Sequence, residues 1–242
     1  MAGISLAGAG ALLVGCRRGS IQGNADRNEQ TAGELGPADV TATEDLMREH
    51  GVLRRALVVY REAATRLRQD ANSVPPDVLE KTAHLFRVFG EDYHEKKLEE
   101  AYILPLIKKF RNPAEVYVDV LLSQHARGRE ITDYILSVTK GDRIPSNAAT
   151  PLVTALESFA RMYEVHAAIE DTVVFPAWKS SLGESELDEL GAKFEEIEMD
   201  HFGNDYGFES AVDRMREIEA SMGLTDLSTF TAPAPPPTNP AG

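Results

Sequence analysis

Two stretches of this sequence decide its fold: residues 94–105, HEKKLEEAYILP, and residues 166–176, HAAIEDTVVFP. Each begins with a histidine, continues through acidic and apolar residues, and ends at a proline. In both, the closing proline lies six residues after a glutamate, which is Glu99 in the first stretch and Glu170 in the second. The match indicates that one unit of sequence occurs twice in this chain.

Histidines upstream of both stretches extend the duplication. His50 precedes His94 by 44 residues, and His125 precedes His166 by 41. We therefore predict two antiparallel helix pairs related by a pseudo-twofold axis. Such packing would bring all four histidines together at the centre of a bundle.

Helical periodicity runs through most of the remaining sequence. Apolar residues recur at steps of three and four, the spacing of an amphipathic helix, and no stretch shows the convincing alternation of a strand. Four helices are predicted, and they run from about residue 42 to Pro75, from Asp77 to about Pro105, from the Asn112 cap to about residue 139, and from about residue 151 through Val173. A further helical segment extends from about Glu184 to Leu224, with a break between Gly203 and Gly207. The predicted fold class is all-α, an up-down four-helix bundle with an additional C-terminal helical segment.

The two ends of the chain differ in composition from this helical domain, which we place at residues 41–224. Residues 1–16 form an uncharged apolar run that closes on Leu-Val-Gly-Cys and resembles a signal segment with a bacterial lipobox. Residues 17–40 are interpreted as a flexible tether, and residues 225–242 as a proline-rich disordered tail.

The lipobox predicts where the protein is located. Lipidation of Cys16 would anchor the domain to a bacterial membrane on the extracytoplasmic side, and we expect no other membrane contact. No lysine or arginine precedes the apolar run, so the basic start of a signal peptide is missing unless translation begins upstream of Met1. The alternative is an apolar extension without a targeting role.

Composition excludes several classes of partner and site. The formal net charge is −14, and nucleic-acid binding needs a basic surface, so no nucleic-acid partner is expected. The single cysteine, Cys16, excludes an intrachain disulfide framework and a thiolate zinc cluster. A metal in this chain would therefore be held by nitrogen and oxygen ligands.

The candidate metal ligands lie on the predicted helices. Four are histidines, one on each helix: His50, His94, His125 and His166. Burying several imidazoles together without a metal would be costly. Glu170 lies four residues after His166 and shares its helical face, whereas Glu99 lies five residues after His94 and needs a one-residue π-bulge to align with it. The proline spacing favours Glu99 over its acidic neighbours.

This pattern resembles the hemerythrin-like (HHE cation-binding) family, whose repeated His and His-x-x-x-Glu units are known for non-haem di-iron sites. The resemblance covers roughly residues 42–222. It implies a cofactor of two Fe ions, bridged by carboxylate and by an oxo or hydroxo group. Oxygen-carrying members place a second histidine four residues after the one on the third helix, but here that position is Arg129. The resemblance therefore implies iron binding more directly than reversible oxygen carriage.

Other residues near these positions are interpreted as follows. His201 continues an apolar face of the fifth segment, and we include it as a candidate fifth imidazole; the alternative is a packing histidine before the glycine break. Arg54 and Arg129 each follow a repeat histidine by four residues and are interpreted as solvated or ion-paired, rather than as supports of the ligands. Tyr163 is expected to be a core aromatic residue.

The predicted function is metal binding by a di-iron centre with an open coordination position for dioxygen or another small diatomic ligand, giving oxygen binding or sensing. The alternative is a di-iron enzyme that consumes peroxide or nitric oxide, or one that oxidises iron for storage. Two Glu-x-x-His steps, Glu91/His94 and Glu198/His201, resemble the ferritin-like ligand motif and favour that alternative. A metal-free structural or partner-binding bundle leaves the convergence of histidines unexplained. The oligomeric state stays open.

Overall fold

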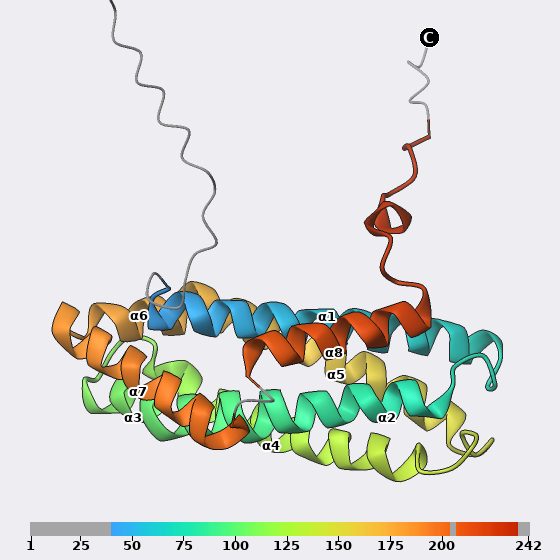
Figure 1. Ribbon diagram of the computed structural model, residues 1–242, viewed down its shortest axis with the longest axis horizontal. Coiled ribbons are helices and arrows are strands. Elements are labelled where there is room, and N and C mark those ends of the chain that lie inside the picture. The colour runs from blue at the N-terminus through green and yellow to red at the C-terminus, as the bar shows by residue number, and fades with distance from the viewer. Residues whose placement is uncertain (1–39, 204–206, 237–242) are drawn as a thin grey trace, which may run out of the picture. The chain divides into compact units, whose positions relative to one another are not determined.

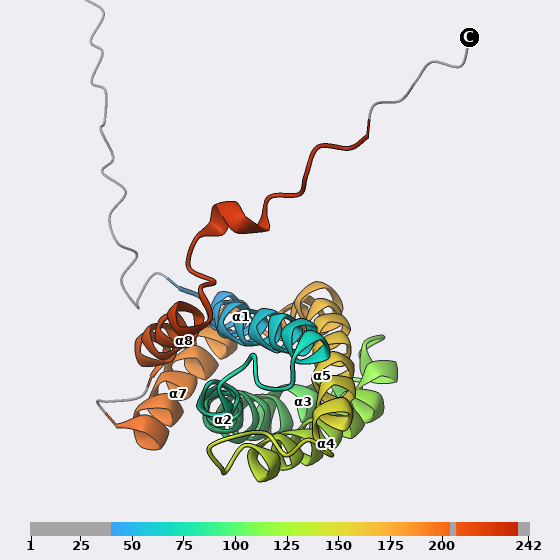
Figure 2. The same cartoon turned by 90° about the vertical axis from the view of Figure 1, so that its right-hand side faces the viewer.

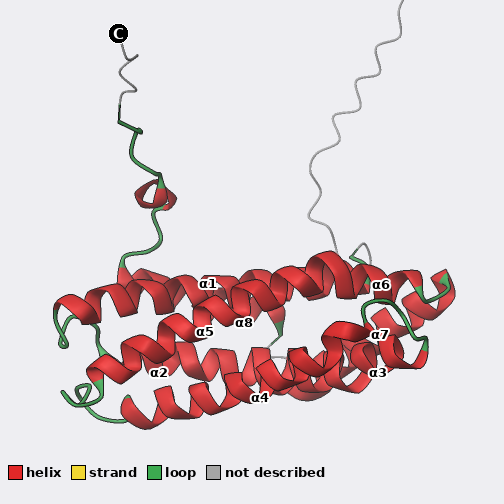
Figure 3. Cartoon of the chain, turned by 180° about the vertical axis from the view of Figure 1, so that it is seen from behind, coloured by secondary structure: helices red, strands yellow, loops and turns green. Residues whose placement is uncertain are grey.

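The fold is helical throughout the part of the chain that the structure describes. The computed structural model describes residues 40–203 and 207–236, and these ranges contain helices and loops but no strand (Figure 3). All of them belong to one unit, Gly36–Gly242. The all-α class predicted from the sequence is therefore confirmed.

Four helical arms form the bundle. Their segments are α1 (Ala42–Gln69); α2 (Pro76–Leu85), which continues as η2 (Phe86–Ile103) and α3 (Leu104–Lys109); α4 (Glu115–Val138); and α5 (Ala149–Ile169), which continues as η3 (Glu170–Val174) and α6 (Phe175–Ser180). Successive arms run in opposite directions, α1 packs along α5, and α4 lies against both α2 and α5 (Figures 1 and 2). The bundle is thus up-down, and each half of the sequence duplication forms one of its helix pairs.

Local sequence sets where the arms begin. Thr41 caps α1, because its hydroxyl accepts the backbone N–H of Glu44 while the Glu44 carboxylate accepts the backbone N–H of Thr41. The predicted cap of the third arm is displaced. Asn112 accepts the backbone N–H of Ala114 in a turn, and α4 begins only at Glu115. The Asn-Pro sequence therefore makes the turn before the helix rather than the cap itself.

Two segments of the bundle are π-helical, and both contain the glutamates of the sequence repeat. The first, η2, carries His94 and Glu99, and the second, η3, begins at Glu170. The i→i+5 hydrogen bonds of a π-helix bring residues five apart toward one face of the helix. Glu99 and His94, which are five residues apart, therefore lie on the same face. The π geometry covers all of Phe86–Ile103, which is more than the single bulge that the spacing predicts.

Aromatic side chains fill the bundle next to its polar centre. Phe159 packs edge-on against Tyr60 and Phe86, with ring centroids 5.4 and 4.7 Å apart. Tyr163 contacts both phenylalanines, and all four side chains are buried. Burial of one phenylalanine contributes roughly 1.5–3 kcal/mol to stability. This cluster therefore packs α1, η2 and α5 together beside the histidines, and Tyr163 contacts His166 at a centroid distance of 5.3 Å.

Two consecutive helices cover one side of the bundle. They are α7 (Glu184–Phe202) and α8 (Phe208–Met222), which pack against α1, α2 and η2 and follow each other in the same direction along the bundle (Figures 1 and 2). Glycines terminate both helices: Gly203 and Gly223 have φ values of 61° and 69°, which side chains rarely adopt. Arg55 of α1 joins α8 to the bundle through two hydrogen bonds of 2.7 Å to Glu219. Together, α7 and α8 are the additional helical segment that the sequence predicts.

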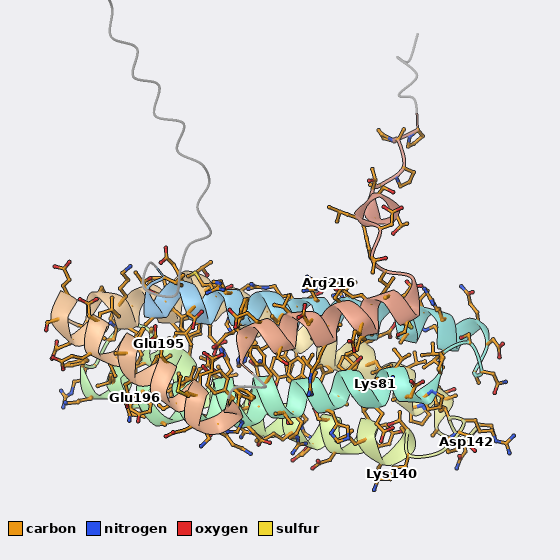
Figure 4. All side chains as sticks on the ribbon, viewed as in Figure 1. Lys81, Lys140, Asp142, Glu195, Glu196 and Arg216 are labelled. Atoms are coloured by element: carbon orange, nitrogen blue, oxygen red, sulfur yellow. The ribbon has the colours of Figure 1, made fainter. Side chains whose placement is uncertain are left out.

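Charged side chains cover the outside of the bundle. Figure 4 labels six that are all exposed: Lys81, Lys140, Asp142, Glu195, Glu196 and Arg216. None of the described helices is both long enough and apolar enough to cross a membrane. The buried histidines and glutamates of the described helices, by contrast, lie inside the bundle.

The predicted terminal segments are largely beyond what the structure describes. The lipobox-like segment 1–16 and the tether, as far as residue 39, lie outside the described residues. Within the stretch interpreted as a disordered tail, the structure has one 3-10 turn, η4 (Leu227–Phe230). Residues 237–242 again lie outside the described part of the chain.

Candidate metal centre

Four histidines meet at the centre of the bundle, one from each arm. His50 lies on α1, His94 on η2, His125 on α4 and His166 on α5, and each is at most 3% exposed. They form two pairs that face each other through their Nε2 atoms. The separation is 3.0 Å between His50 and His94 and 3.2 Å between His125 and His166.

Two glutamates connect these pairs. The Oε1 atom of Glu99 lies 3.3 Å from Nε2 of His94, and its Oε2 atom lies 3.3 Å from Nε2 of His125. The Oε2 atom of Glu170 lies 3.0 Å from Nε2 of His166 and 3.5 Å from Nε2 of His50. Each carboxylate thus reaches one histidine of each pair, as a bridging ligand must.

The other ring nitrogen of every histidine is held by an acceptor outside this group. The contacts of Nδ1 are 2.7 Å from His50 to Asp171, 2.5 Å from His94 to Glu49, 3.0 Å from His125 to Glu100, and 2.9 Å from His166 to Oε1 of Gln124. Carboxylate and amide oxygens only accept, so each Nδ1 donates its proton outward. The Nε2 lone pairs are then oriented toward the centre, as in most metal-binding histidines.

These outer acceptors follow the duplication but were not identified from the sequence. Glu49 and Gln124 each come one residue before the first histidine of a repeat. Glu100 and Asp171 each come one residue after the repeat glutamate. Aligning the two repeats over these flanking positions would have found them.

Arg54 and Arg129, the arginines four residues after the repeat histidines, support the centre. From the sequence they are instead interpreted as solvated or ion-paired, without such a role. Arg54 forms an ion pair with Asp171, the acceptor of His50. Arg129 donates to Glu100, the acceptor of the third-arm histidine, at 2.5 Å. Both are ion-paired, as expected, but each acts on an acceptor that holds a histidine. The matching position four residues after each repeat histidine is the sequence signal for this role.

Burial and neighbouring charges shift the pKa values of the histidines. Burial lowers the pKa of His94, but Glu99 and a second carboxylate outweigh it and raise this pKa well above the usual value. Burial is likewise outweighed at His125, where Glu100 and other carboxylates raise the pKa to about 10. Burial and the charge of His125 lower the pKa of His166 to about 4. Without metal, these carboxylates therefore favour the protonated forms of His94 and His125.

The two glutamates titrate in opposite directions. Burial opposes ionisation of Glu99, but His94 and His125 lower its pKa well below the usual value. Burial and the charge of Glu99 raise the pKa of Glu170 well above its usual value. Within the metal-free centre, the surroundings thus favour ionised Glu99 and protonated Glu170.

The geometry of the centre fits a pair of metal ions. Both oxygens of Glu99 and both of Glu170 are buried without a hydrogen-bond partner among the described residues, which is costly unless a cation satisfies them. Two imidazole nitrogens that bind one ion at about 2.1 Å lie roughly 3.0–3.4 Å apart. Both histidine pairs have this spacing. Imidazole and carboxylate ligands together suit iron, zinc or manganese.

A small cavity lies beside the histidine pairs. Its volume of about 10 Å³ is enough for roughly one water-sized molecule. Leu53 and Leu57 form apolar walls, and Glu95 and Tyr163 add polar ones. The Tyr163 hydroxyl donates to Glu95 at 2.7 Å, and Arg129 donates to the other oxygen of Glu95 at 2.9 Å. Tyr163 is therefore a core aromatic residue, as expected, but it also lines the cavity of the centre.

His201 is not brought to this centre. Its ring stacks on Tyr93 at a centroid distance of 5.9 Å and is half-buried on α7. The glutamates of the two ferritin-like steps also have other contacts: Glu91 accepts from Thr132 at 2.5 Å, and Glu198 accepts the backbone N–H of the first residue of α8 at 2.7 Å. The structure thus brings together the other six candidate ligands of the sequence analysis and leaves His201 aside.

Comparisons with known proteins agree with this architecture. The family model of the hemerythrin HHE cation binding domain matches residues 41–178, the four arms of the bundle. An uncharacterized protein of Mycobacterium bovis and two of Mycobacterium tuberculosis are each 42% identical to this chain over 193 residues. The matched region is 79% of this chain and 74% of each relative. No solved structure matches this chain significantly.

Proposed function

Because the chain belongs to the hemerythrin family of HHE cation-binding domains, we propose that its buried histidines and glutamates hold two non-haem iron ions and that it binds dioxygen or a related small ligand beside them. Family membership accounts for cation binding. The identity of the metal, the number of ions and the small ligand are our proposal.

One observation carries the proposal of two ions. Glu99 offers its two oxygens to histidines of different pairs, at 3.3 Å each, while both oxygens are buried and without a hydrogen-bond partner among the described residues. A single ion would satisfy one pair and leave the other unsupported. A carboxylate between two cations also reduces their mutual repulsion.

The ligands divide between the two ions by pair. His50 and His94 would hold the first ion, and His125 and His166 the second. Glu99 and Glu170 would be shared. The donor groups are two imidazoles and carboxylate oxygens for each ion, a set that suits iron.

When bound, the iron ions supply redox chemistry and open coordination positions for a small ligand. The chain limits what reaches them. Leu53 and Leu57 form apolar walls of the cavity, and its volume of about 10 Å³ admits roughly one water-sized molecule, so access to the ions is restricted to very small ligands. Arg54 also lines it, paired with Asp171 on the outer side of His50.

A second candidate function is the enzymatic one. The Tyr163 hydroxyl and the Glu95 carboxylate line the cavity and are hydrogen-bonded to each other. Protic groups at this place favour reduction of peroxide or nitric oxide, because such reductions consume protons. A protein that only carries a ligand needs apolar walls rather than this pair.

Iron counting and spectroscopy test the proposal. We expect the full chain, reconstituted with ferrous iron without oxygen, to hold two irons, and we expect His125→Ala to hold fewer. His201→Ala is the matched control and is expected to hold two. Reversible spectral change on oxygen cycling supports binding or sensing, whereas net consumption of peroxide supports the enzyme. Fewer than one iron per chain after reconstitution would overturn the di-iron proposal.

A further inference from the structure

The two halves of the centre differ in one outer contact. His50 and His125 are equivalent in the duplication, and both donate to a carboxylate, Asp171 or Glu100, that pairs with an arginine. The other two histidines differ. His94 donates to the carboxylate of Glu49 at 2.5 Å, whereas His166 donates to the neutral amide oxygen of Gln124 at 2.9 Å.

This difference changes the two imidazoles as ligands. A carboxylate attracts the Nδ1 proton more strongly than an amide does, because the hydrogen bond is charge-assisted. The ring of His94 therefore gains electron density at Nε2, and that atom becomes a stronger donor to a cation than Nε2 of His166. Outer-sphere carboxylates of this kind typically change metal affinity by about 10–100-fold.

The surrounding charges do not cancel the difference. Glu49 is 1% exposed, and its ion-pair partner among the described residues is His94 itself. The other half also has an extra carboxylate, Glu95, but it accepts from Tyr163 and Arg129 and forms no hydrogen bond with a histidine of the described chain. Glu49 therefore accepts a hydrogen bond directly from a ligand, whereas Glu95 acts on His125 and His166 only through its charge, next to that of Arg129.

We infer that the two metal positions are unequal: the ion between His50 and His94 binds more tightly and leaves later than the ion between His125 and His166, because Glu49 supports the first pair and Gln124 the second. The inference rests on the proposed two-ion site. Glu49 and Gln124 are positioning residues, since they act through the histidines. Because an amide (Gln124) stands where the first half has a carboxylate (Glu49), we expect the ion between His125 and His166 to be lost first.

A reciprocal exchange tests this inference. Ferrous iron is titrated without oxygen into the full metal-free chain against a chelator of known affinity, and we expect two binding steps. His50→Ala should remove the tight step and His125→Ala the weak one, which assigns the steps to the two positions. Glu49→Gln should weaken the tight step by about 10–100-fold, and Gln124→Glu should strengthen the weak step. The double variant should reverse the order of the two positions.

Controls separate this effect from damage to the fold. Glu62→Gln makes the same chemical change on α1 at an ion pair with Arg66 far from the histidines in sequence, and it should leave both steps unchanged. Thermal melting of the metal-free variants shows whether each one folds. If Glu49→Gln does not fold, Gln124→Glu still tests the inference, because it should strengthen the weak step. Two equal steps in the unaltered chain, or steps that neither exchange moves, would overturn the inference while the di-iron proposal stands. A chain that binds no iron would instead overturn the proposed function.

Discussion

The hydroxyl of Tyr163 lies directly over the backbone of Gly128. A Cβ atom at position 128 would be 1.9 Å from the Tyr163 oxygen and 2.8 Å from Cζ, closer than atoms can approach. Both residues are buried, on α5 and α4 respectively. The absent side chain at Gly128 is therefore what allows the tyrosine to reach Glu95 beside the cavity.

Gly128→Ala is expected to destabilise the protein by roughly 1–3 kcal/mol, because the added methyl group overpacks the interior. The variant should also displace the Tyr163 hydroxyl from Glu95. Gly51→Ala is the matched control: it lies inside α1, and a Cβ there would meet no atom within 4 Å. Alanine should stabilise that helix by up to about 1 kcal/mol. Denaturant unfolding measures both, and equal effects of the two substitutions would contradict the steric argument.

The sequence predicts those parts of the centre that depend on spacing along one helix. His166 and Glu170 share a face because they are four residues apart, and the six-residue step to a proline selects Glu99 as the equivalent of Glu170. The structure brings these residues together with the other repeat histidines. Positions four residues apart on a helix determine a shared face without any knowledge of tertiary packing.

The contacts that the sequence does not predict join residues on different arms. Gln124 of α4 holds His166 of α5, and Tyr163 reaches Glu95 on η2. These contacts depend on how far each arm slides along its neighbour, which a helical period does not specify. For His201, the sequence predicts a place at the centre that the structure does not give it. His201 continues an apolar stripe, but its ring stacks on Tyr93 rather than facing the centre.

Substitution of Glu99 should reduce iron binding more than substitution of its neighbour. Glu99→Ala removes the side chain that reaches both pairs, so we expect fewer than two irons per chain even at saturating ferrous iron. Glu100→Gln changes only the acceptor of His125 and should lower affinity by about 10–100-fold while two irons still bind at saturation. Iron analysis after gel filtration distinguishes the two. Full loading of Glu99→Ala would exclude a bridging role for this residue.

Metal binding should release protons. In the metal-free centre the pKa values of His94, His125 and Glu170 are raised, which favours the protonated form of each group. A metal ligand must lose its proton, and we expect up to about three protons per chain to be released on loading with ferrous iron. Affinity should therefore fall as the pH falls. An indicator dye in weakly buffered solution measures the release, and a pH-independent affinity between pH 6 and 8 would contradict it.

Glu91 should make the metal-free protein less stable as the pH rises. Burial raises its pKa from 4.5 to about 7, although the hydrogen bond from Thr132 lowers it. A group whose pKa is raised on folding contributes stability that is fully present below its unfolded pKa and is lost as the pH rises through the folded value. One pKa unit corresponds to about 1.4 kcal/mol, so the loss between pH 5 and pH 8 should amount to a few kcal/mol.

The neutral variant Glu91→Gln should remove the contribution of Glu91 to this dependence, because its amide oxygen still accepts from Thr132 but carries no charge to bury. Asp45, whose pKa burial also raises to about 7, should keep its own contribution. Thr132→Val should increase the loss of stability between pH 5 and pH 8, because it removes the hydrogen bond that lowers the pKa of Glu91. Denaturant unfolding with a chelator present, at pH 5 and pH 8, measures all three proteins. If Glu91→Gln loses as much stability as the unaltered chain over this range, another group causes the loss and Glu91 is not the buried acid that titrates near neutral pH.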